Sequence, residues 1–145
     1  LLLWRKVQVE ATRKEKPFRY ETMVSDVSEQ AVEIAQRNVK RAGLSDDITV
    51  EKRDFRRVRP GQGPGVVMVN PPYGERLGDP EEIEELYWTI GDHLKDYYHD
   101  YHAWIFSGQK TALKRIDMMK PDDRIRLLNG AIECELAHYY VLPPK

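Results

Sequence analysis

The sequence contains a single cysteine, Cys134, among its 145 residues. No internal disulfide can therefore form, and this is typical of a reducing compartment, so we expect a cytoplasmic protein. Long apolar runs are missing too, because no stretch approaches the roughly 20 apolar residues that a membrane-spanning helix needs. The opening Leu1-Leu2-Leu3-Trp4 is too short for the core of a signal peptide. We therefore expect no membrane partner.

An excess of positive charge is also missing. Lys and Arg number 23 against 24 Asp and Glu, so the formal net charge is -1. Proteins that hold nucleic acid by bulk electrostatics normally carry a clear positive excess. If this chain acts on nucleic acid, most of the binding affinity must come from another part of the protein or from specific contacts.

Apolar periodicity alternates between helical and strand types along the chain. Helical spacing is found in four segments, at residues 1–16, 28–43, 80–94 and 111–116. Strand patterns are found in four segments between them, at residues 18–25, 48–50, 66–69 and 103–107. The first segment also alternates at Val7, Val9 and Ala11, so a strand remains the alternative there.

The chain closes on two further apolar runs, residues 124–128 and 131–142, joined at Asn129-Gly130. Asn-Gly between apolar runs is a strong hairpin signal. Alternating helices and strands are typical of a mostly parallel sheet covered by helices on both faces. We therefore predict an α/β fold whose sheet ends in an antiparallel hairpin.

The most informative stretch is Asn70-Pro71-Pro72-Tyr73, which directly follows the apolar run 66–69. Two prolines end a strand abruptly, because neither can donate a ladder hydrogen bond. An amide side chain, two carbonyls and an aromatic ring are thereby held at the carboxyl end of a strand, where ligands bind in open α/β sheets. The alternative is a proline-rich turn with an Asn that caps itself.

These groups suit the methylation of an amino group on a planar base. Such a nitrogen is a poor nucleophile, because its lone pair is delocalised into the ring. Hydrogen bonds from its two N–H groups to the Asn70 side-chain oxygen and the Pro71 carbonyl would direct the lone pair at a methyl donor. Tyr73 would stack on the base, which is worth about 1–3 kcal/mol. This chemistry needs no metal, and we predict none.

Two acidic residues are placed to bind an adenosine-containing cofactor. Asp26 ends one predicted strand, and an acid there can accept both hydroxyls of a ribose. Asp54, with Phe55 beside it, follows the next strand and can meet an adenine amino group and ring. Taken singly, Asp26 could be a helix-entry residue and Asp54 a turn residue.

A resemblance to a known family rests on four segments: Asn70 to Gly78, Asp26-Val27-Ser28, Arg37-Asn38 to Ala42-Gly43, and Asn129-Gly130-Ala131-Ile132-Glu133-Cys134. Together they resemble the bacterial large-subunit ribosomal RNA guanine methyltransferases that carry a THUMP domain. The resemblance covers nearly all of residues 1–145. It implies the C-terminal portion of a Rossmann-like class I methyltransferase domain, S-adenosylmethionine as cofactor, and transfer to the guanine 2-amino group of ribosomal RNA.

Carried over by position, the resemblance makes Asp26 and Val27 ribose-side and Asp54 and Phe55 adenine-side cofactor residues. It makes Asn70, Pro71, Pro72 and Tyr73 the catalytic loop, with Asn70 also touching the cofactor. Tyr73, Glu75 and Arg76 would contact the RNA substrate, Arg76 through a phosphate or a guanine edge.

The sequence departs from this family upstream of Asp26. The family carries a glycine-rich strand and loop there, and before it the RNA-binding THUMP domain, and nothing here matches either. The absent strand would be the first and central one, between the Asp26 and Asn70 strands. We therefore expect both parts in the full-length protein. Three alternatives remain: a DNA adenine methyltransferase, a protein glutamine methyltransferase, or an inactive RNA-binding or assembly module.

Overall fold

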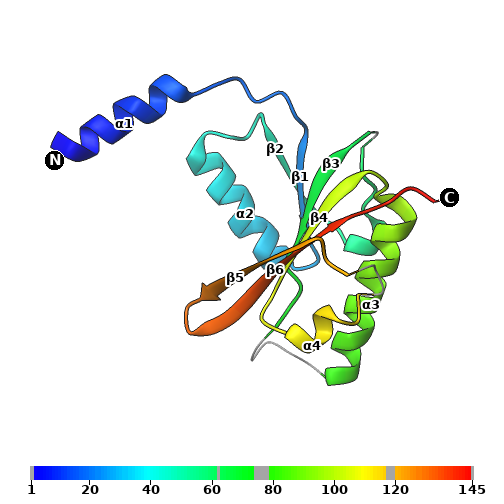
Figure 1. Ribbon diagram of the computed structural model, residues 1–145. Helices are drawn as coiled ribbons and strands as arrows, with labels where there is room; N and C mark the ends of the chain where they lie inside the picture. The colour runs from blue at the N-terminus through cyan, green and yellow to red at the C-terminus, as the bar shows by residue number, and fades with distance from the viewer. Residues whose placement is uncertain (1, 62, 74–78, 117–119, 145) are drawn as a thin grey trace. The chain divides into compact units, whose positions relative to one another are not determined.

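The structure is a computed structural model that describes residues 2–61, 63–73, 79–116 and 120–144 (Figure 1). Two compact units follow each other along the chain. Unit 1 comprises Leu1–Asp54 and unit 2 comprises Phe55–Lys145. None of the helices in the described ranges is long and apolar enough to cross a membrane.

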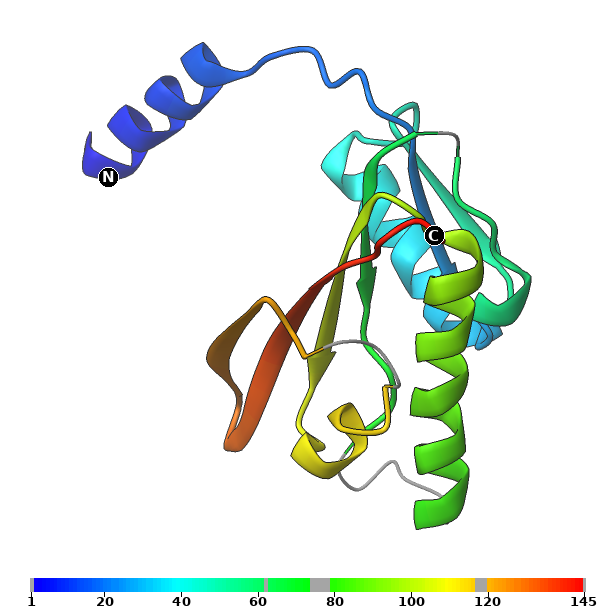
Figure 2. The same ribbon diagram turned by 45° about the vertical axis from the view of Figure 1, so that its right-hand side comes forward.

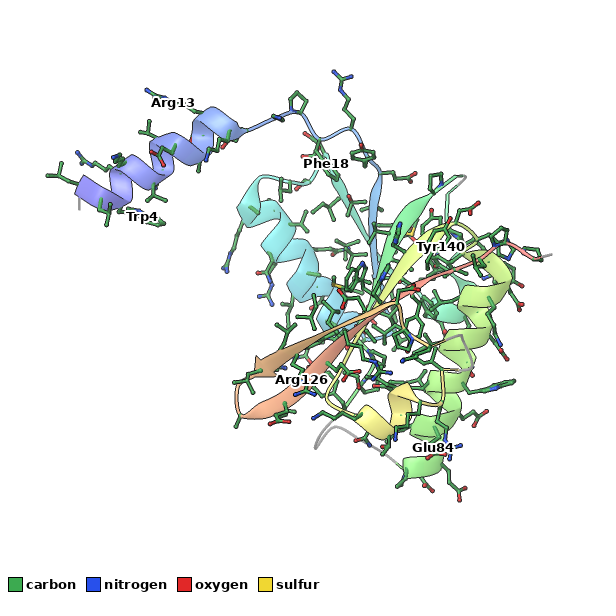
Figure 3. All side chains as sticks on the ribbon, viewed as in Figure 1. Trp4, Arg13, Phe18, Glu84, Arg126 and Tyr140 are labelled. Carbon is green, nitrogen blue, oxygen red and sulfur yellow. The ribbon has the colours of Figure 1, made fainter. Side chains whose placement is uncertain are left out.

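Unit 1 contains two helices and a pair of parallel strands: α1 (Leu2–Lys14), β1 (Thr22–Asp26), α2 (Glu29–Ala42) and β2 (Ile48–Lys52). The helix predicted over residues 1–16 is confirmed, and its strand alternative is wrong. All of its described residues are exposed, and Figure 3 shows side chains, Trp4 and Arg13 among them, on opposite sides of α1.

The strand predicted over residues 18–25 begins only at Thr22 and extends to Asp26. Thr22 is paired with Ile48, the first residue of β2, so the ladder has no partner for earlier residues. Phe18 and Tyr20, which the alternation had included, instead contact each other with ring centroids 5.4 Å apart. Strand length was therefore set by the partner strand.

The ends of α2 match the helical segment predicted over residues 28–43. The Ser28 hydroxyl accepts a hydrogen bond from the Ala31 N–H at 3.3 Å, which caps the helix start. At the other end, Gly43 adopts a left-handed conformation with φ of 72° and donates to the Lys40 carbonyl. These caps place the start of α2 directly after Asp26.

Unit 2 is a four-stranded sheet with order β3-β4-β6-β5. Its strands are β3 (Gly65–Val69), β4 (Tyr101–Ser107), β5 (Asp123–Asn129) and β6 (Ile132–Tyr140), and its helices are η1 (Phe55–Arg57), α3 (Pro80–Tyr97) and α4 (Lys110–Leu113). β3 and β4 are parallel, and β6 is antiparallel to both β4 and β5. The predicted α/β fold with a C-terminal antiparallel hairpin is confirmed.

The strands of the described residues form two sheets, because β1-β2 is a separate ladder from β3-β4-β6-β5. The sequence predicts one sheet that lacks a central strand. In the described residues, neither β1 nor β2 pairs with a strand of the four-stranded sheet.

The core of unit 2 lies between α3 and one face of its sheet, and Figure 2 shows α3 running beside the strands. The spacing of apolar residues predicts one buried face of this helix. Leu86 on that face is half-buried, and the four other members are buried: Ile83, Tyr87, Ile90 and Leu94. Alternate strand residues meet them from the sheet: Ala103, Ile105, Ala137 and Tyr139. Each large apolar side chain buried in this way contributes about 1.5–3 kcal/mol before entropy is counted. This packing holds the carboxyl ends of β3 and β4 in place.

The C-terminal hairpin turns one residue later than the Asn129-Gly130 pair predicts. Asn129 is still in β5 and pairs with Ile132, so Gly130 and Ala131 form the two-residue loop. Gly130 has φ of 61°, a backbone conformation that favours glycine. Asn129 is therefore a strand residue with a side chain available for another contact.

Candidate active site

The predicted catalytic loop leaves the sheet at the carboxyl end of β3. Val69, the last residue of β3, pairs with Ile105 of β4, and the next four residues are Asn70-Pro71-Pro72-Tyr73. Pro71 is buried, Tyr73 is half-buried, and Asn70 and Pro72 are exposed. The structure therefore keeps a rigid turn with an accessible amide at an edge formed by two parallel strands.

Three residues from other elements surround the Tyr73 ring. The Asn129 side chain donates a hydrogen bond from Nδ2 to the Tyr73 hydroxyl at 2.8 Å. Phe106 of β4 meets the ring edge-on, with centroids 5.8 Å apart and an interplanar angle of 83°. A Cβ atom at Gly108 would lie 2.9 Å from Tyr73 Cδ2, so only glycine lets the ring approach this closely.

The sequence does not predict these contacts. The sequence indicates only a turn at Asn129, and Phe106 and Gly108 lie at and just beyond the end of a predicted strand without a motif of their own. The one available signal was the Asn129-Gly130 segment of the family resemblance, which carried no role.

A buried polar pair lies beneath this edge of the sheet. The Tyr87 hydroxyl on α3 hydrogen-bonds the Ser107 hydroxyl at the end of β4. Ser107 Oγ also accepts from the Gln109 N–H at 2.9 Å. Burial raises the pKa of Tyr87 above its usual value, and the Ser107 hydrogen bond opposes that shift. Tyr87 is therefore neutral at physiological pH and serves to join α3 to the end of β4.

The predicted cofactor acids both lie in unit 1, at the carboxyl edge of the β1-β2 pair. Asp26 pairs in register with Lys52, and its carbonyl accepts from the Arg53 N–H at 3.0 Å. Asp54 follows Arg53 and is half-buried, while Asp26 and Val27 are exposed. The two acids are thus at the same end of neighbouring parallel strands.

The Asp26 carboxylate is held in a defined orientation. Its Oδ1 accepts from the Ser28 N–H at 2.7 Å, at the start of α2. The Asp26 side chain is exposed, so its carboxylate is accessible from solvent. A carboxylate acceptor suits the hydroxyls of a ribose in an adenosine-containing cofactor, and its role in binding stays a prediction.

Phe55, the predicted adenine-side ring, belongs to unit 2. It packs against His93 with centroids 4.9 Å apart and stacks on Tyr98 at 6.0 Å. Phe55 is half-buried by these contacts, and its proposed contact with adenine stays a prediction. Glu75 and Arg76 lie outside the described residues, so their predicted contacts with substrate also stay predictions.

The structure thus groups the predicted site residues in two sets. Asp26, Val27 and Asp54 are in unit 1, and the set of Phe55 and the loop 70–73 is in unit 2. Each set lies where its own strands end. Their meeting in one site remains a prediction from the sequence.

Histidines in unit 2 form a pair in which His102 Nδ1 lies 2.9 Å from His138 Nε2. Trp104 packs on His138 with centroids 4.4 Å apart. Within the described ranges, no group of three or more potential ligands is arranged to hold a metal ion.

Comparison with solved structures defines the class of fold. SMU.472, a protein assigned as a methyltransferase and crystallised in complex with SAH, matches 97% of this chain and 37% of its own, with a TM-score of 0.84 and 25% identity. A predicted N6-adenine-specific DNA methylase from Listeria monocytogenes matches 82% of this chain and 30% of its own, with a TM-score of 0.68 and 27% identity. The predicted methyltransferase fold is therefore confirmed.

The family model for the RMKL-like methyltransferase domain matches residues 2–138, and the chain belongs to this family. Ribosomal RNA large subunit methyltransferase K/L of Methylococcus capsulatus is 34% identical over 148 residues, which cover all of this chain. The chain spans about a fifth of the length of that relative (20%). The family that the four sequence segments resemble is confirmed.

Proposed function

We propose that this chain is the part of an S-adenosylmethionine-dependent enzyme that presents a guanine 2-amino group in large-subunit ribosomal RNA for methylation. The observation that carries the proposal is the loop Asn70-Pro71-Pro72-Tyr73 at the carboxyl end of β3, with its ring held in place by β4 and the hairpin. The names of relatives in the family, ribosomal RNA large subunit methyltransferases K/L, support this substrate.

The residues of the loop would act mainly by positioning. S-adenosylmethionine, when bound, supplies an electrophilic methyl group. The Asn70 side-chain oxygen and the Pro71 carbonyl would accept hydrogen bonds from the two N–H groups of the base amine. The lone pair of the amine nitrogen is then directed at the methyl group. The amine loses a proton readily once alkylated, so the loop needs no strong base. Tyr73 would cover the face of the extruded base.

The cofactor would be held in part by unit 1. The exposed carboxylate of Asp26 would accept hydrogen bonds from the ribose hydroxyls. The Ser28 N–H already donates to one of its oxygens, Oδ1, and so fixes the orientation of the carboxylate. Asp54 would face the adenine amino group. This arrangement is supported by the position of both acids at the carboxyl edge of parallel strands.

Asn70→Ala in the protein at its natural full length tests the role of the loop. We expect methyl transfer to fall by about 100-fold or more, as for the loss of a positioned polar group at a reacting centre. Cofactor affinity, measured by calorimetry, should fall far less than methyl transfer, because Asp26 and Asp54 would still hold the adenosine part of the cofactor. Gln8→Ala removes an amide from an exposed position of α1 and should leave both quantities unchanged. Near wild-type turnover by Asn70→Ala would contradict the role of Asn70.

The substrate is tested by offering naked large-subunit ribosomal RNA, duplex DNA and a glutamine-containing protein to the same enzyme. The likeness to the predicted DNA methylase of Listeria monocytogenes makes duplex DNA the main competitor. We expect the label from the cofactor in ribosomal RNA, at the 2-amino group of guanine. If the label is found in adenine of DNA, the proposed substrate is wrong. The proposed chemistry of the loop would still hold.

A further inference from the structure

The tip of the β5-β6 hairpin reaches the ring that the proposed function places against the base. Asn129 is 56 residues from Tyr73 in sequence, yet its Nδ2 lies 2.8 Å from the Tyr73 hydroxyl. The bond joins the last residue of β5 to the loop that follows β3. Those strands are at the two edges of the four-stranded sheet, so the contact spans the sheet's width.

This contact and the packing of the ring restrict different movements. The hydroxyl lies on the long axis of the Tyr ring, so a hydrogen bond to it fixes where that axis points. Phe106 meets the ring edge-on, and Gly108 leaves no space beside Cδ2, so these two residues restrict rotation about the axis. A base can stack well only if both the direction and the plane of the ring are set.

We propose that Asn129 is a positioning residue for methyl transfer, which acts by holding the Tyr73 hydroxyl and thereby the plane on which the base is stacked. The inference rests on the proposed function of the loop. Asn129 itself is exposed and need not touch the reacting atoms. The hydrogen bond also leaves the Tyr73 hydroxyl proton free to point elsewhere, because the Asn129 amide is the donor.

A purely structural role in the hairpin must be separated from this positioning role. Asn129 closes the hairpin opposite Ile132, and its loss could loosen the turn. Gly130→Ala is the matched control, because φ of 61° makes the turn unfavourable for alanine while the atoms of the Asn129 to Tyr73 contact remain. A structural effect should appear in both variants, and a positioning effect only in Asn129→Ala.

The test is a double-mutant cycle of Asn129→Ala and Tyr73→Phe in the protein at its natural full length. Single-turnover methyl transfer to ribosomal RNA is measured at saturating cofactor and RNA. Because one exposed neutral hydrogen bond is lost, we expect each single variant to lower the rate constant about three- to tenfold. Adding Asn129→Ala to Tyr73→Phe should change the rate less than about twofold, since the shared bond is already absent.

Several results would overturn the inference. One is that Asn129→Ala lowers the rate constant by the same factor in the wild type and in Tyr73→Phe. The effect would then come from the hairpin and not from the hydrogen bond to Tyr73. Another is a Gly130→Ala loss as large as that of Asn129→Ala at a temperature where all variants are folded. An unchanged rate in Asn129→Ala would also overturn it. These outcomes leave the proposed function intact, whereas a wild-type protein that methylates no guanine removes both.

Discussion

At the scale of single residues, the contact surfaces around Tyr73 leave no spare volume at Gly108. A Cβ atom there would lie 2.9 Å from Tyr73 Cδ2 and 2.9 Å from Ile132 Cγ2. Tyr73 is held by its hydrogen bond to Asn129, whereas the Ile132 side chain is partly exposed. Relief of the clash would therefore require at least the Tyr73 ring to shift.

Gly108→Ala should accordingly destabilise the chain by about 1–3 kcal/mol, the usual cost of overpacking. The measurement is urea unfolding followed by near-UV circular dichroism. Gly61→Ala is the control, because a Cβ at Gly61 meets no atom within 4 Å, and its effect should stay within about 0.5 kcal/mol. Equal stability of the two variants would contradict the close approach of Tyr73 to Gly108.

The identity of the loop residues could be predicted from the sequence, but their neighbours could not. Asn70 to Tyr73 carry a recognisable pattern in four consecutive positions. Phe106, Gly108 and Asn129 contact Tyr73 only because β3, β4 and the hairpin pack side by side. Contacts between residues so distant in sequence depend on packing, which no local pattern encodes.

At the scale of elements, the hairpin depends on one backbone conformation. Gly130 has φ of 61°, in the left-handed region where an L side chain is unfavourable. Asn tolerates this region better than Ala, because its short polar side chain can hydrogen-bond locally. The hairpin should therefore distinguish these two substitutions.

We expect Gly130→Ala to lower the free energy of unfolding by about 1–2 kcal/mol, and Gly130→Asn by less. Chemical unfolding with circular dichroism measures both. Hydrogen exchange should show the loss first in the amides of β5 and β6, whereas α3 should keep its protection. Identical losses in the two variants would mean that the turn does not hold this conformation in solution.

Element types and most boundaries could be predicted, because their signals are local. Ser28 and Gly43 bound α2 as their chemistry predicts, and α3 buries the face given by its periodicity. The errors lie where a partner sets the limit. β1 starts only where β2 can pair with it, and the hairpin turns at Gly130-Ala131 because Asn129 still has a partner in Ile132.

At the scale of the whole molecule, buried phenols link stability to alkaline pH. Burial raises the pKa of Tyr98 to about 12, to which neighbouring Tyr101 adds while Arg59 opposes it, and burial likewise raises the pKa of Tyr139 to about 12. The unfolded value is about 10. Folding thus favours the neutral phenol. The contribution of each phenol to the free energy of unfolding is therefore complete below pH 10 and is lost as the pH rises to 12.

Ionisation of each of these tyrosines should lower the free energy of unfolding by about 3 kcal/mol between pH 10 and 12. Tyr98→Phe and Tyr139→Phe remove the titrating group and keep the ring, so each variant should lose less stability than the wild type between pH 10 and 12. Unfolding free energies from urea titrations at several pH values measure the difference. At pH 8 the variants serve as their own control, because both phenols are then neutral in either state. Parallel curves for variant and wild type would contradict the burial effect.

Local sequence was sufficient for the helices, the strands, the caps of α2, the rigid Asn-Pro-Pro-Tyr turn and the family. These features depend on residues a few positions apart, whose periodicity and backbone preferences act within one element. The starting point of β1 and the enclosure of Tyr73 by Phe106, Gly108 and Asn129 were settled by strand pairing and packing. Pairing and close approach join residues tens of positions apart, and their free energy exists only once the elements are in contact.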